Sequence, residues 1–160
     1  MRFLIWLGLI VPNLLIAQDF SGLNRISFES AEDYALQEDQ VLSCCKYLLE
    51  HPIYQEDLKR LQATQFMLRW AEGTPDLSIA LDTRITDLAA KNSDLLGVFI
   101  AAWIEAGLES EGQDLPEADL RKAAYQRLYR YIKAGNNVKQ KGAIKKFVKM
   151  GDAGRQEEWR

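Results

Sequence analysis

The sequence predicts an all-α protein, a single compact bundle of about five to six antiparallel helices around one buried central helix. Residues 94–108, DLLGVFIAAWIEAGL, are almost wholly apolar and lack the polar stripe of a surface helix. Elsewhere apolar residues recur at three- and four-residue steps, and only one short stretch alternates as a strand does. Because the apolar run is shorter than the roughly 20 residues that cross a bilayer, it indicates a buried helix.

The chain begins with the layout of a secretory signal peptide. Arg2 supplies a positive end, an apolar region follows, and Ala17 offers a cleavage site before Gln18. We therefore expect residues 1–17 to be removed and the protein to be exported, either periplasmic or secreted. The alternative is an uncleaved leader that anchors the chain in a membrane.

The rest of the chain has the size of one domain that folds without a disulfide or a metal. We expect an irregular segment at residues 18–29, an α-helical domain at residues 30–150 and a polar tail at residues 151–160. The first predicted helix begins at Ser30, a good cap, and ends at residues 51–52, His-Pro, because the residue before proline avoids helical angles.

Two adjacent cysteines lie inside this first predicted helix. Cys44 and Cys45 both fall on apolar stripes, so we expect two small buried thiols. A redox or metal role requires partners at ligand spacing, and the sequence supplies none.

The second predicted helix begins at residue 53 or 55 and ends at Glu72, before a glycine suited to a left-handed cap. One apolar side is expected to face inward. It is marked by Leu58, Leu61, Leu68 and Ala71 and widened by Ala63, Phe66, Met67 and Trp70. Residues 77–81 alternate like a strand. Because no second strand is available, we expect an extended connector that presses Leu77, Ile79 and Leu81 onto the helices.

The second half of the chain contains four further predicted helices. A short helix begins at residue 82 or 83, and Asn92 and Ser93 separate it from the central helix. After a linker at residues 110–115, Pro116 suits the first turn of the next helix, and the last helix spans about residues 141–150.

A pair of aromatic residues occurs twice, as Phe66/Trp70 and as Phe99/Trp103, with a spacing of 33 residues. A helical-repeat arrangement is therefore the alternative architecture. The neighbouring positions do not repeat, and aromatic residues four apart are also good partners within one helical core.

No motif of a known catalytic centre is present. GxSxG, GxGxxG, HExxH, CxxC and a Walker loop are all missing, and His51 is the single histidine. We therefore expect no metal site and no cofactor, and we favour a protein that is not an enzyme.

The most distinctive local string is WAEGTPD, residues 70–76, which places an indole and two carboxylates around a tight turn. Glu105 is a third acid, in the otherwise apolar helix, where an unpaired charge is costly. If Glu72, Asp76 and Glu105 converged near Trp70, they could bind a cation or act as an acid and its base. The alternative is that Glu105 pairs with a cation such as Arg69 or Arg84, while Glu72 and Asp76 cap and solvate the turn.

The charge is divided unevenly along the chain. Residues 18–112 carry 17 acidic and 7 basic side chains, whereas residues 113–160 carry 6 and 12. The C-terminal lysines form a basic strip, whose members are Lys139, Lys141, Lys145, Lys146 and Lys149. Export argues against nucleic acid, and the simpler interpretation is a solvated face opposite the core. Contact with anionic lipid or polysaccharide is the alternative.

The strings LKRLQATQFMLRWAEGTPD and SDLLGVFIAAWIEAGLE, with the AQ ending of the leader, resemble a family of small exported helical proteins of unknown function from Bacteroidota. The likeness runs from Leu48 to Leu108. It implies a compact helical domain outside the cytoplasm and assigns no site residue.

Together these patterns predict an exported α-helical binding or interaction module of the cell envelope, with an unidentified protein or envelope partner. The first alternative is a small enzyme or cation-binding protein that uses the carboxylates near Trp70. The second is attachment to an anionic surface through the basic C-terminal helices. Membrane association is expected only through an uncleaved leader or the basic strip.

Overall fold

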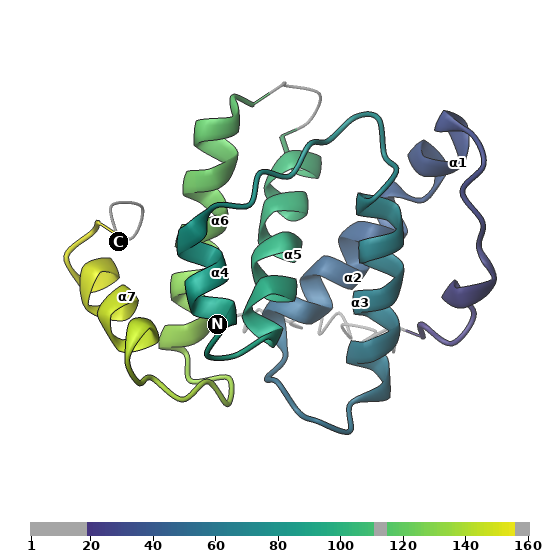
Figure 1. The fold of residues 1–160 in the computed structure, drawn as a ribbon. Helices are drawn as coiled ribbons and strands as arrows, with labels where there is room; N and C mark the ends of the chain where they lie inside the picture. The colour runs from purple at the N-terminus through teal and green to yellow at the C-terminus, as the bar shows by residue number, and fades with distance from the viewer. Residues whose placement is uncertain (1–18, 111–114, 156–160) are drawn as a thin grey trace, which may run out of the picture.

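The structure, a computed structural model, describes residues 19–110 and 115–155 (Figure 1). The leader expected at residues 1–17 lies outside these ranges. The described residues form seven α-helices and one 3₁₀ turn, with no strand, which confirms the all-α class. The elements are η1 (Leu23–Arg25), α1 (Ala31–Leu36), α2 (Glu38–Glu50), α3 (Leu58–Ala71), α4 (Thr83–Ala89), α5 (Asp94–Leu108), α6 (Glu117–Lys133) and α7 (Ala143–Asp152).

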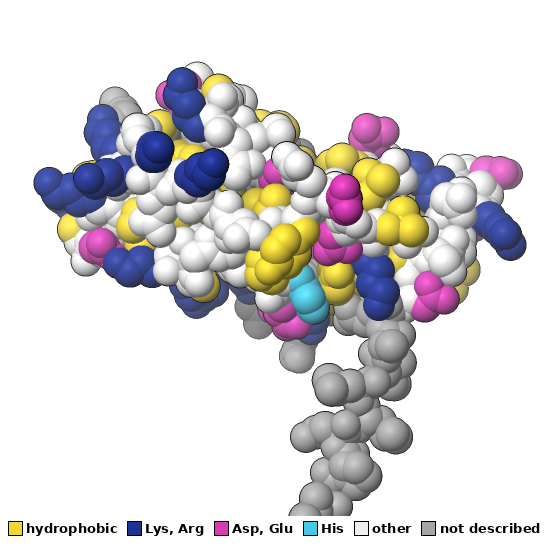
Figure 2. Space-filling model, turned by 90° about the horizontal axis from the view of Figure 1, so that it is seen from below, with side chains coloured by type: hydrophobic (Ala, Val, Ile, Leu, Met, Phe, Trp, Pro, Cys, Tyr) yellow, Lys and Arg dark blue, Asp and Glu magenta, His cyan; other side chains and the backbone are white. Residues whose placement is uncertain are grey.

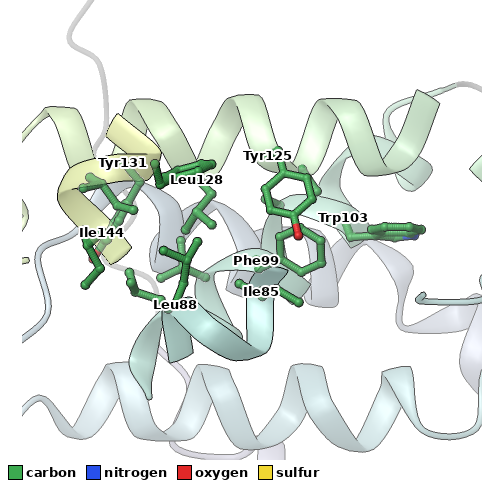
Figure 3. Packing of buried hydrophobic residues seen from close by; sticks show 14 of the residues in the cluster. Ile85, Leu88, Phe99, Trp103, Tyr125, Leu128, Tyr131 and Ile144 are labelled. Atoms are coloured by element: carbon green, nitrogen blue, oxygen red, sulfur yellow. The ribbon is translucent and has the colours of Figure 1, made fainter. Parts of the chain in front are cut away.

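Helix α5 contributes to both parts of the hydrophobic core. It begins and ends where its apolar run does, and side chains on most of its circumference are buried. One face packs with α4, α6 and α7, and Figure 3 shows Phe99 and Trp103 among the side chains of these helices. Another face packs with α2, α3 and η1. None of the described helices has both the length and the apolar character needed to cross a membrane.

The first predicted helix is two helices, which corrects the prediction of one helix after Ser30. Ser30 caps α1 as expected, since its Oγ accepts a hydrogen bond from the backbone N–H of Asp33 at 3.4 Å. The chain then leaves helical geometry at Gln37, and α2 follows. Helix α1 buries no residue completely, and Leu36 is 77% exposed. The break lets α1 reach the end of α3 (Figure 1) while α2 packs against α5.

Helix α3 begins at Leu58, later than predicted, because the Asp57 carboxylate caps it and accepts a hydrogen bond from the backbone N–H of Arg60 at 2.9 Å. The predicted apolar side of α3 faces the core in part, since Leu68 and Ala71 pack partly buried against it and four further residues are fully buried. These four are Ala63, Phe66, Met67 and Trp70. Leu58 and Leu61 are 64% and 53% exposed, so their predicted inward orientation is wrong. A helix at the edge of a core buries one face, and here the side with Phe66 and Trp70 occupies it.

The connector at residues 77–81 is extended and unpaired, as predicted. Leu77 and Ile79 pack against the core, whereas Leu81 is exposed, contrary to the prediction for that side chain. The chain turns at Leu81 to enter α4, because Asp82 caps this helix through the backbone N–H groups of Arg84 and Ile85.

Helix α7 continues to Asp152, past the residue 150 at which the sequence predicts its end. Gly151, expected to start the tail, is buried within α7 beneath Tyr129. A Cβ atom at Gly151 would lie 2.2 Å from Cδ2 of Tyr129, so this glycine permits the close approach of α6 and α7.

Candidate functional site

A cleft of about 440 Å³ opens where the ends of four helices meet, at the start of α2, the end of α3, the end of α5 and the start of α6. Its apolar wall is formed by Trp70, Leu77, Leu108, Leu115 and Leu120. Three carboxylates also line it, from Glu38, Asp76 and Glu117. No basic side chain of the described residues lines the cleft. The site therefore combines apolar contact area with negative charge.

Trp70 is fixed in place by α1. The indole is fully buried in the protein core, and its Nε1–H donates to the carbonyl oxygen of Tyr34 at 3.0 Å. The ring of Tyr34 stacks on Phe28, with centroids 4.8 Å apart, and lies over Gly73. A Cβ atom at Gly73 would lie 1.9 Å from the Tyr34 hydroxyl oxygen.

Because Gly73 has no Cβ atom, the ring of Tyr34 can lie close to the backbone at the end of α3. Gly73 does not adopt the left-handed backbone that the sequence predicts there, because Glu72 ends α3 in a right-handed conformation. The turn of residues 70–76 is thus shaped by the contact of Tyr34 with the end of α3.

Glu38 lies among negative charges at the cleft. Partial burial raises the pKa of Glu38 above its usual 4.5, and the negative charges of Asp76 and then Asp39 raise it further. Such a group gains from a nearby positive charge, which relieves the repulsion. The electrostatics of the cleft therefore favour a cation.

The four residues predicted near Trp70 do not form one cluster. Trp70 and Asp76 line the cleft, whereas Glu72 is exposed and lines a separate hollow on the outer side of α3. Glu105, on α5, is paired with Arg127 on α6, whose Nε–H donates to Oε2 of Glu105 at 2.6 Å. The described residues contain no group of three or more His, Cys, Asp or Glu side chains placed to hold a metal ion.

Glu105 pairs with a cation, which confirms the alternative given for it, but the partner is Arg127 and not Arg69 or Arg84. Arg69 donates instead to the carbonyl oxygen of Leu23 at 2.8 Å, and Arg84 pairs with Asp82. Arg127 is 22 residues away from Glu105 in sequence, so no local pattern indicates the pair. The sequence does not single out Glu38 and Glu117 as site residues. Each lies in the first turn of a helix, where the helix dipole favours an acid whether or not the acid has a functional role.

The five lysines of the basic strip are all exposed. Figure 2 shows dark-blue Lys and Arg side chains gathered at the end of the molecule where α7 lies in Figure 1. The strip is thus separate from the cleft, which none of its lysines line.

Both cysteines are fully buried and lie outside the cleft. Burial raises the pKa of Cys44 from 9.0 to about 12 and raises that of Cys45 as well. The thiolate, which is the reactive form of cysteine, is therefore strongly disfavoured in both.

We expect Ellman's reagent to label the native protein at least about a hundredfold more slowly than the unfolded protein, because burial suppresses the thiolate and blocks access. The release of thionitrobenzoate with and without denaturant measures this ratio. The denatured sample, which should titrate two thiols, is the control. Labelling of the native protein at the unfolded rate would show that the thiols are accessible.

Neither protein-family models nor curated proteins nor solved structures yield a match to this chain. No residue role therefore transfers from a relative, and the cleft is judged on its own geometry. Its volume lies within the range of about 300–1,000 Å³ that is usual for small-ligand sites.

Proposed function

We propose that this protein is an exported α-helical binding module of the cell envelope, and that the cleft at the ends of α2, α3, α5 and α6 is its ligand site. The observation that carries the proposal is the lining of the cleft, an apolar wall beside three carboxylates with no basic side chain among the described residues. The same proposal has three further parts. They are export through residues 1–17, membership of the Bacteroidota family of small exported helical proteins, and an antiparallel arrangement of the helices around α5.

The lining supports one chemical class of ligand. Glu117 pairs with Arg121 on the same helix, so Glu38 and Asp76 are the carboxylates with the most to gain from a positive ligand. Leu77, Leu115 and Leu120 offer contact area to an apolar group. We infer a small organic cation with an apolar part, such as an amine, as the class of ligand.

The proposal predicts that phenethylammonium, used as a probe, binds the wild-type protein and that Asp76→Asn weakens this binding about tenfold, about 1.4 kcal/mol. The substitution keeps the side-chain size and removes one of the two charges that attract the cation. Isothermal titration calorimetry measures the affinity. Asp87→Asn, which removes an exposed carboxylate of α4 outside the cleft, is the matched control and should bind as wild type does.

The pH dependence gives a second readout of the same prediction. Because the pKa of Glu38 lies above 4.5, this side chain takes up a proton at a higher pH than an ordinary glutamate does. Cation binding should therefore weaken as the pH falls through that raised pKa, and Glu38→Gln should remove this part of the pH dependence. Binding that is equally tight in wild type and Asp76→Asn, or that does not change with pH, would contradict the proposal.

A further inference from the structure

A patch of exposed lysines lies on and beside α7. Its apolar side chains, Ile144, Phe147 and Val148, are buried in the core. The lysines project from the other side of the helix or precede it, and all are exposed. The basic face is defined here by Lys139, Lys141, Lys145, Lys146 and Lys149.

The acidic group on α7 does not neutralise this basic face. Asp152 accepts hydrogen bonds from Nζ of Lys133 at 2.6 Å and from the hydroxyl of Tyr129 at 2.7 Å, both on α6. These contacts lower the pKa of Asp152, with the bond from Lys133 as the main cause, so the carboxylate stays ionised and engaged with α6. Asp152 is therefore engaged with α6, while the five lysines of the basic face are exposed.

The residue type indicates what such a face can bind. Lysine is a compact, hydrated charge on a flexible stem, whereas arginine forms the fork that grips a single phosphate or carboxylate. A face made of lysines suits negative charge that is spread over a surface. The headgroup layer of an anionic bilayer has this character, and each nearby lysine strengthens attachment to it by about fivefold.

The packing of α7 also sets the mode of attachment. An amphipathic helix that inserts into a bilayer must expose its apolar side, and α7 keeps that side in the protein core. Attachment through the basic face is therefore electrostatic and leaves the fold intact.

We propose that the basic face of α7 docks this protein onto the surface of an anionic lipid bilayer without insertion. This docking proposal rests on the proposed function for its cellular location, because the cell envelope contains the lipid bilayer that the basic face would contact. The docking itself is independent of the cleft, which lies at other helix ends. Loss of one activity therefore leaves the other measurable.

The test is co-sedimentation of the protein, purified from the cell, with vesicles of equal parts phosphatidylcholine and phosphatidylglycerol, and with vesicles of phosphatidylcholine alone. We expect binding to the anionic vesicles only. Raising the ionic strength from about 0.1 M to about 1 M should release the protein, since the Debye length shortens from about 10 Å to about 3 Å.

A pair of double variants assigns the binding to α7. Lys145→Gln/Lys149→Gln should weaken binding to anionic vesicles about 25-fold, from two lysines at about fivefold each. Arg25→Gln/Lys59→Gln removes two exposed charges from the α3 side of the molecule and should leave binding within about twofold of wild type. All four positions are exposed, and circular dichroism checks that the variants keep the fold.

Several outcomes would overturn the docking proposal. Binding that resists salt, or that is equal on both kinds of vesicle, would indicate attachment through the apolar leader. An equal loss in the two double variants would remove the assignment to α7. Binding to a sulfated polysaccharide but not to anionic vesicles would replace the bilayer by a polymer as the partner. Asp76→Asn should bind vesicles as wild type does, which separates this test from that of the cleft.

Discussion

Trp103→Ala is expected to lower the free energy of unfolding by about 3–5 kcal/mol, the usual cost of removing a large aromatic side chain from a core. Trp103 is fully buried on α5, with its ring centroid 5.8 Å from that of Phe99. It belongs to the buried cluster that contains residues of α4, α5, α6 and α7, so the substitution would leave a cavity in that cluster (Figure 3). Urea denaturation followed by circular dichroism measures the loss.

Trp103→Phe is the informative companion of this substitution. The Nε1–H of Trp103 is buried and has no hydrogen-bond partner in the described part of the chain, so phenylalanine removes an unsatisfied donor along with some volume. Its cost should be well below that of alanine. Leu58→Ala, on the exposed side of α3, should cost less than about 1 kcal/mol. If Trp103→Ala cost no more than Leu58→Ala, the position of α5 in the core would be wrong.

Arg60→Met is expected to destabilise the protein by about 2–3 kcal/mol, because it removes a buried charged donor while keeping a similar apolar volume. Nη1 of Arg60 donates to the carbonyl oxygens of Leu48 at 3.3 Å and His51 at 3.2 Å. The carbonyl of Leu48 would normally accept from the residue four positions later, which is Pro52 and has no N–H. Arg60 thus replaces a missing bond at the end of α2, where the helix dipole also favours a cation.

In Arg60→Met, the carbonyl of Leu48 should account for most of the lost stability, because it would lose its hydrogen-bond donor. The carbonyl of His51 keeps a second partner, the hydroxyl of Tyr131 at 2.9 Å. The guanidinium also lies over the Tyr131 ring, 6.0 Å from its centroid, which adds a cation–π contact. Lys59→Met removes an exposed charge next in sequence and is the control, with an expected change within about 0.5 kcal/mol. Thermal and urea unfolding of both variants test the difference, and equal stabilities would contradict this role.

Several elements could be predicted because their signals are local. The apolar run of α5 predicts its bounds, and Ser30 and Asp82 are recognisable caps. The glycine and two asparagines of residues 135–137 adopt the positive φ angles that end α6. Each of these features depends on a few neighbouring residues, so no knowledge of the distant chain is needed.

The candidate site could be predicted only in part. Trp70 and Asp76 were found because they share one short string, and both line the cleft. Glu38 and Glu117 join them from helix ends that are remote in sequence, and Glu105 leaves the group for Arg127. Residue type shows that a carboxylate needs a partner, but the partner is set by which helices pack together.

The helical class, the burial of α5 and the basic and apolar sides of α7 follow from the order of the residues alone, because helical periodicity is a property of consecutive residues. Three further features come from how the helices pack: which apolar residues of α3 are buried, where α1 departs from α2 and which carboxylates share a cleft. Those outcomes depend on competition between segments far apart in the chain for the same buried surface, and a local pattern carries no record of that competition.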